Sequence, residues 1–154
     1  MSLATMHQIT VRRLSGADRF ALEEMYESFV PLGEALGLPP RDPERRRAWL
    51  NSLAEGIQFA AWAGGVLAGH LALLPEDHEA ELTCFVHQDY RRQGIATALA
   101  ETAVGAAAQA GISTIWVLID NHNAAARRGL LKFGFRIAWE DHVESKFVYA
   151  VAGK

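Results

Sequence analysis

The sequence predicts an α+β domain built around a mixed, mostly antiparallel sheet. Apolar runs with a β-type period alternate with segments of helical period along the whole chain. A two-glycine turn, Gly64-Gly65, joins two of the β-type runs into a hairpin, because glycine supplies the positive φ angles of tight turns. The chain has 154 residues, of which 50% are hydrophobic. This is the size and composition of one domain, so we expect residues 1–154 to form a single unit.

The first elements are a strand and two helices. Residues 9–14 form a short β-type run. A helical segment follows, with apolar residues at Phe20, Leu22, Met25, Tyr26 and Phe29. Prolines and glycines then predict a loop over residues 30–41. Asp42-Pro43-Glu44 supplies an N-cap, a first-turn proline and a first-turn acid for a second helix, which Gly56 can end.

Three antiparallel strands and a long helix follow. Residues 58–63 and 66–74 flank the two-glycine turn, and residues 75–78 reverse the chain again. Residues 80–86 form the third strand, which places Glu81, Thr83 and Phe85 on one face. Residues 94–110 are rich in alanine and end at Gly111, a pattern typical of a helix.

The last elements are a buried strand, a helix and a hairpin. Residues 112–119 are β-branched and apolar, as a buried strand requires. Residues 123–133 are predicted to form a helix that Gly134 ends. Residues 135–139 and 146–151 then flank the polar turn at residues 140–142 as a final hairpin.

Charge and composition exclude several classes of protein. Fifteen basic residues against 18 acidic ones give a net charge of -3, which disfavours a nucleic-acid-binding protein. The single cysteine, Cys84, and the absence of a signal peptide favour a cytoplasmic protein without disulfides. No apolar stretch is long enough to span a membrane. The six histidines have no metal-ligand spacing, so we expect no metal site.

The segment with chemical information is residues 89–97, between an apolar strand and the long helix. The first N–H groups of a helix have no intrahelical partner and form a site for phosphate oxygens. Gly94 and Ala96 would let a phosphate approach the backbone. The same residues also suit an ordinary strand-to-helix turn, so this segment alone leaves both interpretations open. Neither a GxGxxG motif nor a P-loop is present, which excludes the usual dinucleotide and nucleotidase sites.

The chain resembles the GNAT superfamily of N-acetyltransferases. The family signature, Gln/Arg-x-x-Gly-x-Gly/Ala, reads here Arg91-Arg92-Gln93-Gly94-Ile95-Ala96. The preceding Cys84-Phe85-Val86-His87 is similar to the family's apolar strand end. Asn123-Ala124-Ala125-Ala126, leading to Lys132-Phe133-Gly134-Phe135, is similar to its second motif. The resemblance covers the order of elements from end to end.

This resemblance implies a more detailed fold and a cofactor. The fold would have three α/β/α layers, with about seven strands, four flanking helices and splayed central parallel strands. The cofactor would be acetyl-CoA, with its pantetheine between the strands that end near Val86 and Ile119. The residues implied to bind it are Phe85, Val86, Arg91, Arg92, Gln93, Gly94, Ile95, Ala96, Thr97 and Asn123. Two of these residues also suit plain structural roles, Asn123 as a helix N-cap and Arg91 as a solvated cation.

Glu81 is the candidate general base. An amine with a pKa near 10.4 is almost fully protonated at neutral pH, so its attack on a thioester benefits from a base. The spacing from Glu81 to Gly94 is similar to that of the Pat-type bacterial protein lysine acetyltransferases, whose catalytic glutamate occupies this place. The alternative is a solvated glutamate on an exposed strand face. Glu79, on the same face, is the second candidate.

The tyrosine that protonates the leaving thiolate in many family members is absent. Its position, seven residues after Asn123, holds Leu130. A thiol with a pKa near 8.5 can leave as thiolate or take a proton from water, so transfer remains possible. The Pat-type enzymes, by resemblance, also lack this tyrosine. Tyr90 and Tyr149 are possible substitutes.

Two variable segments are expected to bind the acceptor. By resemblance these are residues 30–41 and 140–144. The second carries Glu140, Asp141 and Glu144, which would favour a cationic primary amine. The first is apolar, with Leu36, Leu38, Pro39 and Pro40, and would either wall the cleft or pack on a second subunit of a possible homodimer.

The sequence therefore predicts an acetyl-CoA-dependent N-acetyltransferase. Transfer would go directly to a small-molecule amine or a protein lysine in a ternary complex, because no activated nucleophile is visible. The alternative is a non-catalytic acyl-CoA-binding or regulatory module with the same fold.

Overall fold

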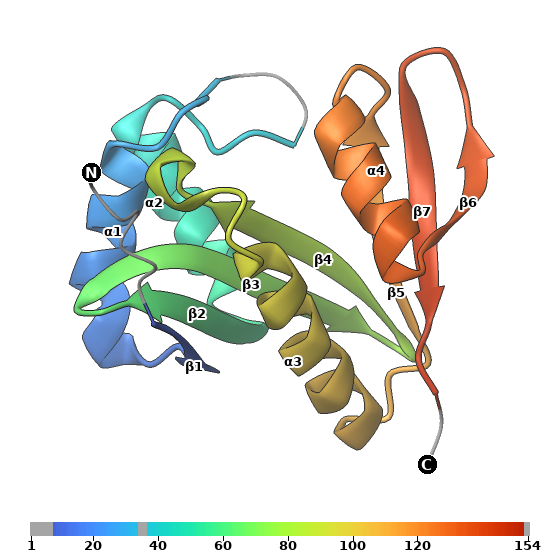
Figure 1. Cartoon of the computed structure of the whole chain (residues 1–154), viewed down its shortest axis with the longest axis horizontal. Coiled ribbons are helices and arrows are strands. Elements are labelled where there is room, and N and C mark those ends of the chain that lie inside the picture. The colour runs from blue at the N-terminus through green and yellow to red at the C-terminus, as the bar shows by residue number, and fades with distance from the viewer. Residues whose placement is uncertain (1–7, 34–36, 153–154) are drawn as a thin grey trace, which may run out of the picture.

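The computed structural model describes residues 8–33 and 37–152 of the chain. Within them, seven strands form one mixed sheet in the spatial order β1-β2-β3-β4-β5-β7-β6 (Figure 1). The strands are β1 (Ile9–Arg13), β2 (Ile57–Ala63), β3 (Val66–Glu76), β4 (Glu79–Val86), β5 (Thr114–Asp120), β6 (Arg136–Glu140) and β7 (Glu144–Ala150). The helices are α1 (Arg19–Glu27), α2 (Pro43–Leu53), α3 (Ile95–Gln109) and α4 (Ala124–Phe133). The predicted fold class is confirmed.

Helices cover both faces of the sheet, which gives three layers. α3 and α4 lie on one face, and α1 and α2 lie on the other (Figure 1). Leu99 of α3 and Phe147 of β7 are fully buried in the core on the first face. Tyr26 of α1 and Leu50 of α2 are buried in the core on the second. The alternation of side chains along each strand supplies both cores at once.

The central parallel strands separate after only three residue pairs. β4 and β5 pair Glu79 with Thr114, Ala80 with Ile115 and Glu81 with Trp116. Beyond Glu81 the two strands diverge toward one end of the sheet (Figure 1). Strand backbone that faces such an opening has hydrogen-bonding groups to offer to an extended ligand. The splayed arrangement expected from the family resemblance is confirmed.

Two boundaries differ from the sequence prediction. β3 continues through Pro75, which pairs with Ala80 of β4, so the turn is shorter than expected. Proline has no backbone N–H to donate. It is tolerated at residue 75 because β3 pairs with β2 only as far as Leu73, so no β2 carbonyl lies opposite Pro75. α2 ends at Leu53 rather than at Gly56. Gly56 instead allows close packing, since a Cβ there would lie 2.2 Å from the Leu73 carbonyl oxygen.

The C-terminal elements differ by a few residues. β5 begins at Thr114 rather than residue 112, because Ile112 closes the end of α3 by donating its N–H to Ala107. β7 begins at Glu144 and so leaves a shorter turn than expected. In the loop of residues 30–41, Pro39 is buried, whereas Leu36 lies outside the described residues. No helix in the described ranges is long and apolar enough to cross a bilayer.

A buried histidine joins α1 to the sheet. His70 of β3 is fully buried, with Nε2 at 2.7 Å from Gln58 Oε1 and Nδ1 at 2.8 Å from the Tyr26 hydroxyl. The amide oxygen of Gln58 can only accept, so Nε2 carries the proton and Nδ1 accepts from Tyr26. Burial lowers the pKa of His70 from 6.5 to about 4.

This pKa predicts an acid-sensitive fold. Between about pH 7.5 and about pH 5 the free energy of unfolding should fall by about 2 kcal/mol. At about pH 5 the His70 side chain is protonated in the unfolded chain but still neutral in the folded protein, so protonation favours unfolding. The contribution is complete above pH 6.5 and declines as the pH falls toward 4. Urea unfolding at the two pH values measures it. His70→Gln should lose less stability on acidification, whereas a change at exposed His78, His78→Gln, should leave the loss intact. Equal losses in all three proteins would contradict the assignment.

Candidate active site

The turn before α3 has the geometry of an anion site. Arg92 and Gly94 have positive φ angles of 65° and 78°. The first intrahelical bond runs from Ala98 N–H to Gly94 O, and no side chain caps the helix. The N–H groups of residues 95–97 therefore point out of the helix end without intrahelical acceptors, at the positive end of its dipole. A helix end of this kind can hold a phosphate.

The residues of this turn divide into two kinds. Ile95 is buried against the sheet and contacts Gly69 of β3, so it can offer a ligand only its backbone. The other residues from 91 to 97 are exposed. A Cβ on Gly94 would meet no atom within 4 Å, which leaves open space over the helix end.

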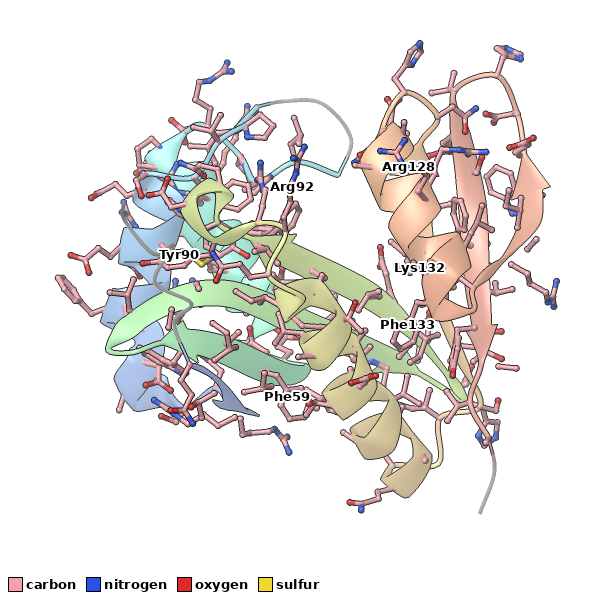
Figure 2. All side chains as sticks on the ribbon, viewed as in Figure 1. Phe59, Tyr90, Arg92, Arg128, Lys132 and Phe133 are labelled. Atoms are coloured by element: carbon pink, nitrogen blue, oxygen red, sulfur yellow. The ribbon has the colours of Figure 1, made fainter. Side chains whose placement is uncertain are left out.

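A groove runs from this helix end between α3 and α4. Its volume is about 490 Å³, and it is lined by Thr97, Glu101, Val104, Gly129, Lys132, Phe133 and Tyr149. Figure 2 shows Lys132 and Phe133 on the side of α4 that faces α3. It shows Arg92 and Arg128 toward the end of the molecule at which β4 and β5 diverge. The groove lies on the sheet face that α3 and α4 cover, and its lining includes Thr97 of the first turn of α3, so it adjoins the candidate anion site.

Glu81 lies at the point where the central strands separate. It belongs to the last β4–β5 pair, with Trp116, and its side chain is half-buried. Burial raises the pKa of Glu81 above its ordinary value of 4.5. Glu79 is exposed. The two candidate bases therefore differ in environment, and only the first combines partial burial with a place beside the strand opening.

Leu130, which holds the position of the family's tyrosine, and the two substitute tyrosines lie in different parts of the structure. Leu130 of α4 packs against the apolar core. Tyr149 forms a ring cluster with Phe133 and Phe135, at centroid distances of 5.4 and 5.3 Å, and borders the groove between α3 and α4. Tyr90 packs near His87, with ring centroids 6.2 Å apart. Of the two tyrosines, Tyr149 is the one that lines the groove.

Two residues expected to bind the cofactor have protein partners. Asn123 caps α4, since its Oδ1 accepts the N–H of Ala126 at 3.1 Å. The Arg91 guanidinium donates to the Val86 carbonyl at 3.0 Å and to the Val30 carbonyl at 2.8 Å. The Arg91 guanidinium thus has two carbonyl partners that the sequence did not indicate.

Comparison with known proteins decides the family. The acetyltransferase (GNAT) family model matches residues 22–135, well over half of the chain. The chain belongs to the acetyltransferase (GNAT) family. Its activity class is therefore N-acetyl transfer with acetyl-CoA as donor, as the two motifs indicated. No curated protein sequence matches the chain closely enough to narrow this class.

Solved structures support the same architecture. The ribosomal-protein-S18-alanine N-acetyltransferase of Escherichia coli has 20% identity and a TM-score of 0.77, over 96% of each chain. The ribosomal-protein-alanine N-acetyltransferase of Brucella melitensis has 20% identity and a TM-score of 0.74, over 92% of this chain and 99% of the other. The yncA protein of Salmonella typhimurium, solved with its cofactor acetyl-CoA, has 19% identity and a TM-score of 0.73, over 94% of each chain. At these identities the likeness shows a common fold.

The acidic turn of this GNAT protein is not a single cluster. Glu140 accepts from Arg127 at 3.2 Å and from Ser145 at 2.9 Å. Hydrogen bonds from the Glu144 and Val143 amides lower the pKa of Asp141, so its charge serves the turn itself. Glu144 is different, because its Oε1 is buried and has no hydrogen-bond partner among the described residues. Of the three expected carboxylates, Glu144 alone has a buried acceptor oxygen to offer.

Sequence reasoning missed two groups on the sides of the GNAT site. Arg128 and Lys132 are spaced four residues apart on α4, a spacing that places both on one side of a helix and that the sequence already contained. On the opposite sheet face, the Lys146 ammonium lies 4.8 Å from the centroid of the Trp116 ring. That contact depends on the pairing of Leu118 with Lys146, which only the three-dimensional register reveals.

Proposed function

We propose that this protein transfers an acetyl group from acetyl-CoA to a primary amine by direct attack in a ternary complex, with Glu81 as the general base. The observation that carries the proposal is the position of Glu81. Its half-buried carboxylate sits at the last paired position before the strands separate, with the α3–α4 groove on one sheet face and the carboxylate on the other. Donor and acceptor can therefore reach the same point from opposite faces.

The residues of this chain fit acetyl-CoA. The amides of residues 95–97, with Gly94 and Arg92, suit the pyrophosphate. The edge of β4 that separates from β5, near Phe85 and Val86, suits the amides of pantetheine. Gln93 and Ala96 complete the exposed turn. Lys132 adds positive charge to the groove, and Arg128 lies one turn before it on α4. When bound there, acetyl-CoA supplies a thioester that is activated toward amines.

The role of Glu81 follows from its surroundings. Partial burial moves the pKa of its carboxyl toward neutrality, which makes it a stronger proton acceptor than a solvated glutamate. A proton taken from the ammonium form of the acceptor would rest on this carboxylate. Tyr149 borders the groove and is the candidate acid for the thiolate, and a thiol with a pKa near 8.5 can also leave without one.

The acceptor class rests on charge and resemblance. A small-molecule amine or a protein lysine both offer the required primary amine. Glu81 and Leu130 together support a likeness to the Pat-type lysine acetyltransferases. Asp120 and Glu144 are paired across β5 and β7 on the same sheet face as Glu81, and the three carboxylates outnumber the Lys146 ammonium on that face, which favours a cationic acceptor.

An amine panel tests this proposal. We expect mass spectrometry to find acetylated products after incubation with acetyl-CoA, with cationic amines and lysine peptides converted about tenfold faster than neutral or acidic amines. Activity confined to neutral or acidic amines would contradict the acceptor class. Saturable acetyl-CoA binding without any product across the panel would instead favour the non-catalytic binding module.

A further inference from the structure

The segment that follows β4 is fastened to the start of the loop between α1 and α2. Gln88 makes the shortest of these contacts: its Nε2 donates to the Ser28 carbonyl at 2.7 Å, and its Oε1 accepts the Val30 N–H at 2.9 Å. A carboxamide offers a donor and an acceptor together. Gln88 therefore holds this stretch of backbone as a neighbouring strand would, although the segments are about 60 residues apart in sequence.

Arg91 makes a second connection between the same segments. Its Nη2 bonds to the Val30 carbonyl and its Nε to the Val86 carbonyl, so one planar group ties the loop to the end of β4. The guanidinium carbon also lies 5.4 Å from the centroid of the Phe29 ring. Hydrogen bonds from a charged donor are about twice as strong as neutral ones, which makes this the firmer of the two ties.

His87 makes the third connection, and its tautomer is defined. Nδ1 accepts the N–H of Asp89 at 3.2 Å, so the proton resides on Nε2, which donates to the Ser28 hydroxyl at 2.9 Å. His87 is 7% exposed, and its ring packs against Phe29 with centroids 6.2 Å apart. Three side chains from one segment thus hold residues 28–30.

The connection joins two parts of the site with different ligands. Arg91 is followed by the cofactor turn, in which Arg92 and Gly94 have positive φ angles. Residues 28–30 lead directly into the loop expected to wall the acceptor. We propose that Gln88 and Arg91 are positioning residues that transmit acetyl-CoA binding at the cofactor turn to the acceptor-side loop. The inference rests on the proposed function, because it takes acetyl-CoA as the ligand of that turn.

Coupling of this kind has a direct physical consequence. A ligand that restrains the turn also restrains whatever is hydrogen-bonded to it, so residues 28–33 are restrained in part before the acceptor arrives. The coupling is reciprocal: an acceptor that orders the loop tightens acetyl-CoA binding by the same factor.

Hydrogen–deuterium exchange with acetyl-CoA as the probe tests the inference. In the wild-type protein, saturating acetyl-CoA should slow amide exchange in residues 95–98 and, by at least about fivefold, in residues 28–33. In Gln88→Ala the slowing at residues 95–98 should persist, and in both Gln88→Ala and Arg91→Ala the slowing at residues 28–33 should fall to less than about half. Arg91→Lys, which can donate to one of the two carbonyls, should recover part of it. Gln109→Ala, at the far end of α3, is the matched control and should behave as wild type.

The outcomes separate the inference from the proposed function. Slowing confined to residues 95–98 in the wild type, or unchanged slowing at residues 28–33 in both alanine variants, would overturn the coupling while leaving acetyl-CoA binding intact. No slowing anywhere, together with no heat of acetyl-CoA binding by calorimetry, would refute the proposed function and this inference with it. Absence of slowing at residues 28–33 in the wild type overturns the inference even if a variant unfolds.

Discussion

Glu81→Gln should lower kcat by about 10²- to 10⁴-fold and leave the Kd for acetyl-CoA within about twofold of wild type. Glutamine keeps the size and partial burial of the side chain but cannot take a proton from the acceptor ammonium. Glu81 lies outside the cofactor turn, so donor binding should not change. Steady-state kinetics and calorimetry on the same preparations measure the two quantities.

The pH dependence and a neighbouring variant make this prediction specific. Glu81 must be deprotonated to act, so activity should rise with pH through a pKa above the ordinary 4.5, as its burial requires. Glu79→Gln makes the same chemical change at the exposed position on the same strand face and should retain kcat within about twofold. Full activity in the Glu81 variant, or loss in the Glu79 variant, would move the base elsewhere.

Ala96→Glu should weaken acetyl-CoA binding by about 100-fold or more without destabilising the fold. The substitution puts a carboxylate on the exposed first turn of α3, where the pyrophosphate is proposed to bind, and like charges repel. The same carboxylate interacts favourably with the helix dipole, so the melting temperature should stay level or rise. Binding and stability should thus change in opposite directions.

Gln109→Glu is the matched control for this charge. It adds one negative charge to an exposed position at the other end of α3, far from the turn. Calorimetric titration should give an acetyl-CoA Kd within about twofold of wild type. If Ala96→Glu bound acetyl-CoA normally, the helix end would not be the pyrophosphate site.

Local signals explain why much of the fold was predictable. Gly64-Gly65 and the Asp42-Pro43 helix start act within a few residues of themselves, and the structure has the hairpin and helix they indicate. The geometry of the turn before α3 was predictable for the same reason, since Gly94 marks both a positive φ angle and a helix start. The likeness of two motifs to a known family then supplied what local signals lack, namely the parallel pairing of β4 with β5.

Long-range pairing explains what was missed. One carbonyl partner of Arg91 belongs to Val30, 61 residues away, and nothing near Arg91 in sequence distinguishes a cation bonded to carbonyls from one facing phosphate. The ion pair of Glu140 was missed for the same reason, because its partner, Arg127, lies on α4 and is distant in sequence from the acidic turn. His70 lies on a strand with buried neighbours. Its bond to Tyr26 depends on the packing of α1, and its bond to Gln58 depends on the pairing of β2 with β3.

Single-turnover transfer from prebound acetyl-CoA tests the central claim most directly, with wild type and Glu81→Gln compared on the amine that the panel identifies. Premixing saturates the donor site, so the rate reports acetyl transfer rather than donor binding. We predict rapid appearance of acetylated amine with the wild type and a rate lower by about 10²-fold or more with the variant, at equal acetyl-CoA occupancy. Equal rates from the two proteins would contradict Glu81 as the base at the strand opening.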